Sequence, residues 1–155
     1  MAQNGFEVRQ TDFTEPEVRA LVEFHLAKMY ETSPADGVFA LGLEALQQRE
    51  ITGFAAWDGA RLLGVGALKD CAGYGEIKSM RSAPDAAGKG IGSAILNAIE
   101  RCAKARGMSS LKLETGPPPH FNAANRFYEK HDYSLSGPFG DYVENDHSVF
   151  YAKSL

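Results

Sequence analysis

The sequence predicts one α/β domain of the α+β kind that spans residues 1–155, and three observations lead to this prediction. Strand-like and helix-like patterns alternate along the chain, which is typical of a sheet covered by helices. The chain has 155 residues, of which 44% are hydrophobic and 23% are charged, so it can bury a single core. The stretches of turn-forming residues are short, and neither a repeat nor a linker divides the sequence.

The first fifty residues predict a strand followed by two helices. Hydrophobic and polar residues alternate from Phe6 to Gln10, as they do in a half-buried strand. Pro16 suits the first turn of a helix. That helix is expected to continue to about Tyr30, because hydrophobic residues recur on one face. A second, short helix is expected from Leu43 to Gln48.

The middle of the chain predicts three strands. The segments Ile51 to Trp57 and Leu62 to Lys69 are rich in hydrophobic residues and are joined by Asp58-Gly59. An Asp-Gly pair between two such segments favours a hairpin turn. The third strand is expected from Glu76 to Ser82, so a hairpin should lead directly into another strand.

The last third of the chain predicts two helices, each followed by a strand. The longer helix runs from Ile91 to Arg106, and Gly107 is a typical residue to end it. A strand is then expected from Leu111 to Glu114. The shorter helix, Asn122 to Lys130, precedes a closing strand from Ser148 to Lys153.

A glycine-rich loop precedes the longer helix, with glycines at positions 88, 90 and 92. Glycine lets a ligand approach the backbone closely, and a helix start offers unpaired N–H groups, so the loop predicts a phosphate site. A Walker A motif would need glycine and serine or threonine where the chain has Ala83 and Gly90, and a dinucleotide motif would need glycine at Ser93. A turn that binds no ligand stays open as an alternative.

The segment Ala87-Gly88-Lys89-Gly90-Ile91-Gly92 resembles the pyrophosphate loop of the GNAT superfamily of acyl-CoA-dependent N-acetyltransferases, written Q/R-x-x-G-x-G/A. Ala87 stands where that pattern has Gln or Arg, which removes a side-chain contact and leaves the backbone cradle. The resemblance implies acetyl-CoA as co-substrate. It also implies a pyrophosphate site made of Gly88, Lys89, Gly90, Ile91, Gly92 and Ser93.

The predicted order of elements also resembles the GNAT fold. That resemblance implies a mixed, mostly antiparallel sheet of about six or seven strands, with helices on both faces and a splay between the fourth and fifth strands. The runs EIKSMR, LETG, FYEKHDY and GPFGDY are most similar to a branch of small, poorly characterised bacterial members. The fold also leaves a homodimer through a C-terminal edge strand open.

The fourth strand of this fold binds the pantetheine arm through its backbone. The matching positions here are Met80, Arg81 and Ser82. A main-chain N–H near Met80 or Arg81 would face the thioester oxygen, where negative charge develops during attack by an amine.

The resemblance implies that Tyr128 is the catalytic acid. It matches the tyrosine of the family signature lYekxGF, whose hydroxyl protonates the departing thiolate. Asp132 stands where the signature has Gly, and Asp tolerates the left-handed backbone conformation that Gly would supply. An Asn often found seven residues before the tyrosine is Phe121 here, so Asn122 is the substitute CoA contact.

The catalytic base is expected to be Glu76, since several family members carry a glutamate there. Glu76 lies four residues before Met80, so strand alternation predicts that both share one face with Lys78. Glu114 is the rival base, with His120 and His25 as further candidates.

The acceptor is expected to meet two further parts of the chain. Lys78 or Arg81 could hold a substrate carboxylate, which would make the acceptor an amino acid or a similar small acid, although Lys78 could instead form an ion pair with Glu76. In this family the loop that corresponds to Glu31 to Leu41 often borders the acceptor pocket, so specificity is expected there.

Composition argues against several other classes. The net charge is −4 and no basic stripe is present, which argues against a nucleic-acid partner. No hydrophobic run approaches the roughly 20 residues of a membrane span, and the first residues do not resemble a signal peptide. Cys71 and Cys102 are isolated, so we expect no metal site and a cytoplasmic location.

Together these features predict an N-acetyltransferase domain that moves an acetyl group from acetyl-CoA to a primary amine of a small molecule by direct attack. Neither cysteine lies in a segment expected near the thioester, which disfavours an acyl-enzyme. Two alternatives stay open at this point. One is a non-catalytic acyl-CoA-binding or regulatory module, and the other is a protein or peptide N-acetyltransferase.

Overall fold

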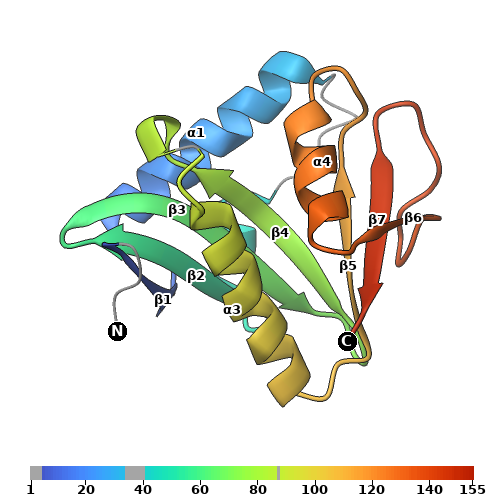
Figure 1. Ribbon diagram of the computed structural model, residues 1–155, viewed down its shortest axis with the longest axis horizontal. Coiled ribbons are helices and arrows are strands. Elements are labelled where there is room, and N and C mark those ends of the chain that lie inside the picture. The colour runs from blue at the N-terminus through green and yellow to red at the C-terminus, as the bar shows by residue number, and fades with distance from the viewer. Residues whose placement is uncertain (1–4, 34–40, 87) are drawn as a thin grey trace.

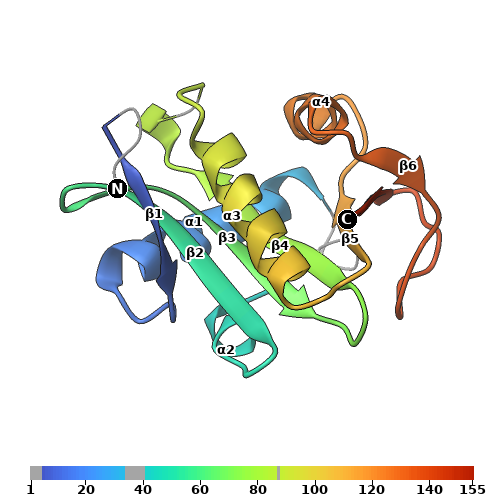
Figure 2. The same cartoon turned by 60° about the horizontal axis from the view of Figure 1, so that its bottom comes forward.

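The computed structural model describes residues 5–33, 41–86 and 88–155, and within these the strands form one seven-stranded sheet. Their order across the sheet is β1-β2-β3-β4-β5-β7-β6, so β1 and β6 lie at opposite edges (Figure 2). The strands are β1 (Glu7–Thr11), β2 (Ile51–Asp58), β3 (Arg61–Asp70), β4 (Gly75–Ser82), β5 (Ser110–Thr115), β6 (Ser134–Ser136) and β7 (Val149–Ser154).

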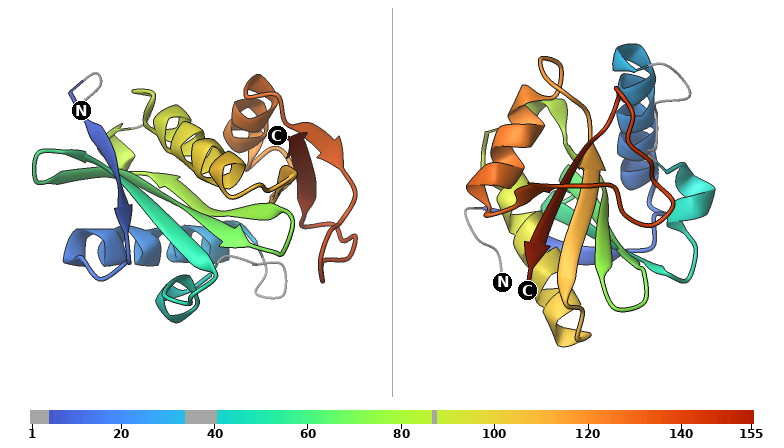
Figure 3. Two further views of the ribbon diagram at one scale, coloured as in Figure 1. Left: turned by 90° about the horizontal axis from the view of Figure 1, so that it is seen from below. Right: turned by 90° about the vertical axis from the view of Figure 1, so that its right-hand side faces the viewer.

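Helices cover both faces of the sheet (Figure 3). On one face lie α1 (Pro16–Thr32) and α2 (Leu43–Leu46), and on the other lie α3 (Ile91–Ala105) and α4 (Asn122–Lys130). A single 3-10 turn, η2 (Pro84–Ala86), follows β4. Each face has its own hydrophobic cluster, one between α1 and the sheet and one between α3, α4 and the sheet.

Only one pair of neighbouring strands within the described sheet is parallel. β4 and β5 pair in parallel at Gly75 with Leu111 and at Glu76 with Lys112, whereas the other neighbours are antiparallel. The two strands are paired only at the end of the sheet near the C-terminus of the chain. Beyond this short contact they diverge from each other (Figure 1). The predicted mixed, mostly antiparallel sheet with a splay between the fourth and fifth strands is therefore confirmed.

Each predicted helix and strand is present, with its ends shifted by at most two residues. The prediction missed η2 and the edge strand Ser134–Ser136, whose three residues are all exposed. A strand this short gives no alternating pattern from which it could be found. Asp132 has a φ of +71°, which confirms the interpretation that it takes the left-handed conformation.

A bulge in β4 corrects one prediction about its faces. Arg81 pairs with Val65 and Lys78 pairs with Ala67, so three steps along β4 match two along β3. The extra residue lies next to Ser79, whose φ is +58°. Strand alternation is broken there.

The bulge turns Met80 and Arg81 to faces opposite those that unbroken alternation predicts. Met80 packs into the cluster below α3, while Arg81 joins Glu76 and Lys78 on the face of α1. The prediction that Glu76 and Lys78 share a face with Met80 is therefore wrong. The expected acceptor loop lies largely outside the described residues, at 34–40, as does Ala87.

Candidate functional site

A cleft of about 840 Å³ opens where β4 and β5 diverge. Its walls come from α1, β4, β5, α4 and the first turn of α3. Because α1 lies on one face of the sheet and α3 and α4 lie on the other, the cleft reaches both faces. Two molecules can therefore approach each other through it from opposite sides.

The glycine loop and the first turn of α3 form one end of this cleft. Gly88 and Gly90 both have a φ of +80°, and a Cβ added at either would meet no atom within 4 Å. The amide of Ala94 bonds to the carbonyl of Gly90, so the amides of residues 91–93 have no partner within the helix. This open backbone fits an anion such as a pyrophosphate.

The end of β4 forms a second wall. Met80, Arg81 and Ser82 line the cleft. β3 pairs with one side of this segment, but the pairing of β4 with β5 ends after Glu76. In the described part of the chain, the other side of residues 80–82 thus has no strand beside it, and an extended ligand can pair there through the backbone.

Ser79 adds an unpaired hydroxyl to this wall. The residue lines the cleft and is 8% exposed. Its Oγ has no hydrogen-bond partner among the described residues. Because an unbonded buried hydroxyl is costly, this oxygen is available to a ligand in the cleft.

Tyr128 reaches the cleft from α4 and is 6% exposed. Its ring makes edge contacts with Phe127 and Tyr133, with centroid distances of 5.1 and 5.8 Å. Burial raises the pKa of its hydroxyl, which therefore stays protonated at neutral pH. No described residue hydrogen-bonds this hydroxyl, so it can donate its proton into the cleft.

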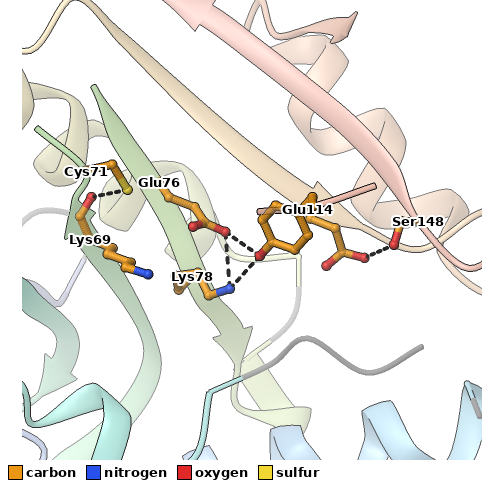
Figure 4. A network of polar contacts seen from close by, with 7 residues as sticks. Lys69, Cys71, Glu76, Lys78, Glu114 and Ser148 are labelled. Atoms are coloured by element: carbon orange, nitrogen blue, oxygen red, sulfur yellow. Dashed lines mark hydrogen bonds and ion pairs between the residues drawn. The ribbon is translucent and has the colours of Figure 1, made fainter. Parts of the chain in front are cut away.

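Glu76 lies in a hydrogen-bonded network with Lys78 and Tyr142 (Figure 4). Its Oε2 accepts hydrogen bonds from the Tyr142 hydroxyl at 2.6 Å and from Lys78 Nζ at 3.1 Å. Lys78 Nζ also donates to the Tyr142 hydroxyl at 2.9 Å. Burial and the charge of Glu76 raise the pKa of Tyr142, which keeps its proton. Glu76 is 4% exposed and does not line the cleft.

Glu114, on β5 across from this network, does line the cleft (Figure 4). Its Oε2 accepts a 2.8 Å hydrogen bond from the Ser148 hydroxyl. Burial raises the pKa of its carboxyl to about 7, against the opposing effects of Ser148 and Lys78. A carboxylate with a pKa near neutrality suits exchange of a proton with a substrate.

Arg81 meets α1 on the face of the sheet opposite α3. Its Nε donates a 2.9 Å hydrogen bond to Nδ1 of His25, and its guanidinium carbon lies 5.9 Å from the ring centroid of Phe24. Burial first, and then the charge of Arg81, lower the pKa of His25 to about 4. The imidazole is therefore neutral at pH 7, with Nδ1 as an acceptor.

The cleft brings together most of the predicted site residues. Those that line it are Met80, Arg81, Ser82, Gly88, Gly90, Ile91, Gly92, Ser93 and Tyr128, and those that do not are Glu76, Lys89 and Asn122. Lys89 and Asn122 are exposed. Sequence reasoning did not single out Ser79 or Tyr142, because neither carries a local signal: their positions follow from the bulge and from contacts over 60 residues apart in the chain.

Among residues 5–33, 41–86 and 88–155, no group of three or more His, Cys, Asp or Glu side chains is placed to hold a metal ion. Each helix within the same ranges is too short or too polar to cross a membrane.

The profile of the acetyltransferase (GNAT) family matches residues 12–133. The chain is 41% identical over 149 residues to YsnE of Bacillus subtilis (strain 168), an uncharacterized N-acetyltransferase, covering 96% of this chain and 99% of the relative. It is 38% identical over 151 residues to YedL of Escherichia coli (strain K12), also an uncharacterized N-acetyltransferase, covering 97% and 95%.

Solved structures share the same fold. A candidate acyl-CoA N-acyltransferase from Klebsiella pneumoniae is similar over 97% of both chains, with a TM-score of 0.80 and 27% identity. An aminoglycoside 6'-N-acetyltransferase complexed with coenzyme A is similar over 96% of both chains, with a TM-score of 0.75 and 18% identity. At that identity the second likeness concerns the fold alone.

Proposed function

Because the chain belongs to the GNAT family of acetyltransferases, and is thus an acyltransferase, we propose that it moves an acetyl group from acetyl-CoA to a primary amine of a small molecule. The observation that carries the proposal is the continuous cleft, which has an anion cradle at one end and Glu114 and Tyr128 in its walls. We propose that residues 1–155 work as one N-acetyltransferase domain.

The glycine loop and the start of α3 would bind the pyrophosphate of acetyl-CoA. The open side of Met80, Arg81 and Ser82 would pair with the pantetheine arm as an added strand. Support comes from the left-handed glycines and from the early end of the β4–β5 pairing. A backbone N–H at the bulge would then face the thioester oxygen, where such a donor lowers the barrier by about 3 to 4 kcal/mol.

Glu114 is better supported as the base than Glu76. An attacking amine must lose a proton, and the base must reach it directly or through one water. Glu114 lines the cleft, and its pKa is raised to about 7. Glu76 lies outside the cleft lining, and its Oε2 is bonded to Lys78 and Tyr142. We therefore assign the base to Glu114 and give Glu76 the task of holding Lys78 and Tyr142.

Tyr128 would complete the transfer as the acid. The amine nitrogen attacks the thioester carbon, the carbon–sulfur bond breaks, and the sulfur takes the Tyr128 proton while Glu114 takes a proton from the nitrogen. The place of Tyr128 in the cleft wall supports this role, because its neutral phenol can donate a hydrogen bond to the sulfur. No covalent enzyme intermediate is needed.

The cysteines bear on the cellular compartment, and the proposed reaction defines the partners. Cys71 and Cys102 are both unpaired, which favours a reducing compartment such as the cytoplasm. The proposed partners are acetyl-CoA and a small amine.

Calorimetric titration with acetyl-CoA, CoA and ATP tests the cradle, and release of free CoA thiol with a panel of small amines tests turnover. We expect micromolar binding of acetyl-CoA, no response to ATP, and thiol release that depends on the amine. Binding without turnover by any amine would favour a non-catalytic acyl-CoA-binding module. No binding of either CoA species would overturn both proposals.

A further inference from the structure

The Arg81 side chain brings a positive charge to the side of the cleft that α1 lines, opposite the glycine loop and α3. The bulge at Ser79 turns Arg81 toward α1, whereas Met80 packs against the helix that begins at the glycine loop. The guanidinium is thus on the sheet face opposite α3. It lines the cleft and is half-buried.

This charge has no carboxylate partner among the described residues. Its Nε is bonded to a neutral imidazole nitrogen of His25, and Phe24 lies below it. The terminal nitrogens make no hydrogen bond or ion pair with residues 5–33, 41–86 or 88–155. Buried cations are usually paired, since removing them from water is costly. The two terminal nitrogens form a planar fork that matches a carboxylate.

Three lysines also line the cleft, and one of them, Lys130, lies on α4 at the other face of the sheet. The other two are already engaged. Lys78 donates to Glu76 and to Tyr142. Lys28 is more exposed and lies 3.5 Å from Glu31. Arg81 is therefore the cation best placed to receive an anion from the acceptor.

The spacing fits a molecule that carries both an amine and an acid. The charges of Glu76 and Lys78 act on Glu114, so Glu114 lies close to them. Arg81 follows Lys78 by three residues, but because of the bulge these match two residues of β3 and span about 7 Å. This separation is within reach of an amino acid that makes one hydrogen bond of about 3 Å at each end.

We propose that the acceptor carries a carboxylate that binds the Arg81 guanidinium, while its amine faces Glu114. The substrate class is thus an amino acid or a close relative rather than a simple amine. His25 acts as a positioning residue that orients the guanidinium through its Nε. This inference rests on the proposed function and adds the identity of the acceptor class to it.

The test compares the twenty protein amino acids with their amides as acceptors, by release of CoA thiol. For at least one amino acid, we expect a kcat/KM that is tenfold or more above the value for the corresponding α-carboxamide. In Arg81→Met, the KM for that acid should rise tenfold to a hundredfold, and the preference over the amide should disappear. Arg61→Met removes an equal charge outside the cleft, where Arg61 pairs with Asp85, and should keep the preference.

Calorimetry with acetyl-CoA alone separates the two proposals. If acetyl-CoA binds and amines are acetylated but no acid is preferred over its amide, the inference is wrong and the proposed function stands. If acetyl-CoA does not bind, the proposed function fails. A loss of acetyl-CoA affinity in Arg81→Met, with the acid preference kept, would assign Arg81 to the CoA site and overturn the inference.

Two further variants keep the test decisive if Arg81→Met does not fold. Arg81→Lys retains the charge but lacks the fork, so the KM for the acid should rise less than in Arg81→Met and more than in Arg61→Met. His25→Ala should raise KM for the acid more than it lowers kcat, because it frees the guanidinium to move. Equal KM effects on acid and amide in both variants would contradict the inference.

Discussion

The hydroxyl of Tyr142 donates a 2.6 Å hydrogen bond to Glu76 Oε2, which joins β4 to a residue 66 positions later in the chain. Lys78 donates to both groups, so its positive charge balances the negative charge of the buried Glu76 carboxylate. We therefore propose a structural task for Glu76, whereas Glu114 is the acidic group that lines the cleft among the described residues.

The first prediction compares Glu114→Gln with Glu76→Gln. In Glu114→Gln, kcat should fall about a hundredfold or more, because the base is lost, while the acetyl-CoA dissociation constant changes little. In Glu76→Gln the free energy of unfolding should fall more than kcat, because the buried ion pair with Lys78 loses its negative charge. The expected cost is a few kcal/mol, or a fall of roughly 5 to 10 °C in the thermal midpoint.

Steady-state kinetics and thermal unfolding of both variants check this assignment. If Glu76→Gln instead loses kcat at unchanged stability while Glu114→Gln stays active, Glu76 is the base as the sequence predicted.

The second prediction concerns pH and follows from the pKa of about 7 for Glu114. The base works when it is ionised, so kcat/KM should rise with pH through about 7, and this step should be absent in the residual activity of Glu114→Gln. The pKa is raised in the folded state, so the folded protein holds the proton more tightly than the unfolded chain. The contribution of Glu114 to stability is therefore lost as pH rises from about 4.5 to about 7.

Glu114→Gln should consequently gain stability relative to the parent protein as pH rises over that range. Urea unfolding at pH 5 and pH 8 measures this difference. A stability difference that does not change with pH would show that the carboxyl titrates at its ordinary value.

The third prediction is that Tyr128→Phe loses kcat about a hundredfold and loses little acetyl-CoA affinity, because only the proton donor is removed. Tyr133→Phe is the matched control. Tyr133 contacts the Tyr128 ring, but its hydroxyl donates to Glu100 at 2.8 Å. That variant should lose stability and keep most of its kcat. Equal losses of kcat and affinity in Tyr128→Phe, or none, would argue against the acid role.

The fourth prediction tests the anion cradle with Ser93→Asp. An acidic residue in the first turn favours the helix, so α3 and the thermal midpoint should be kept. The same charge should repel a pyrophosphate and weaken acetyl-CoA binding tenfold or more by calorimetry. Ser93→Ala is the control, because it also removes the 2.9 Å contact between Ser93 Oγ and His131 Nε2. This variant should weaken acetyl-CoA binding far less. Unchanged affinity in Ser93→Asp would place the phosphates elsewhere.

The local patterns of the chain determined most of the fold. Hydrophobic periodicity and turn residues act within windows of about ten residues, so they located the helices and nearly all the strands. The same holds for the glycine loop before α3, because the left-handed conformations at Gly88 and Gly90 are properties of those residues themselves. The left-handed conformation of Asp132 is likewise predictable from the residue type.

The tertiary structure decided which side chains meet. The bulge at Ser79 sends Arg81 to α1, where its partner His25 lies 56 residues earlier. Tyr142 and Ser148 lie between β6 and β7, and the pairing of these strands within the sheet places them beside Glu76 and Glu114. The pKa of a carboxyl depends on the burial that such packing creates. The sequence by itself therefore determined the family, the strands and the loop, while only packing decided the faces and the charges of the site.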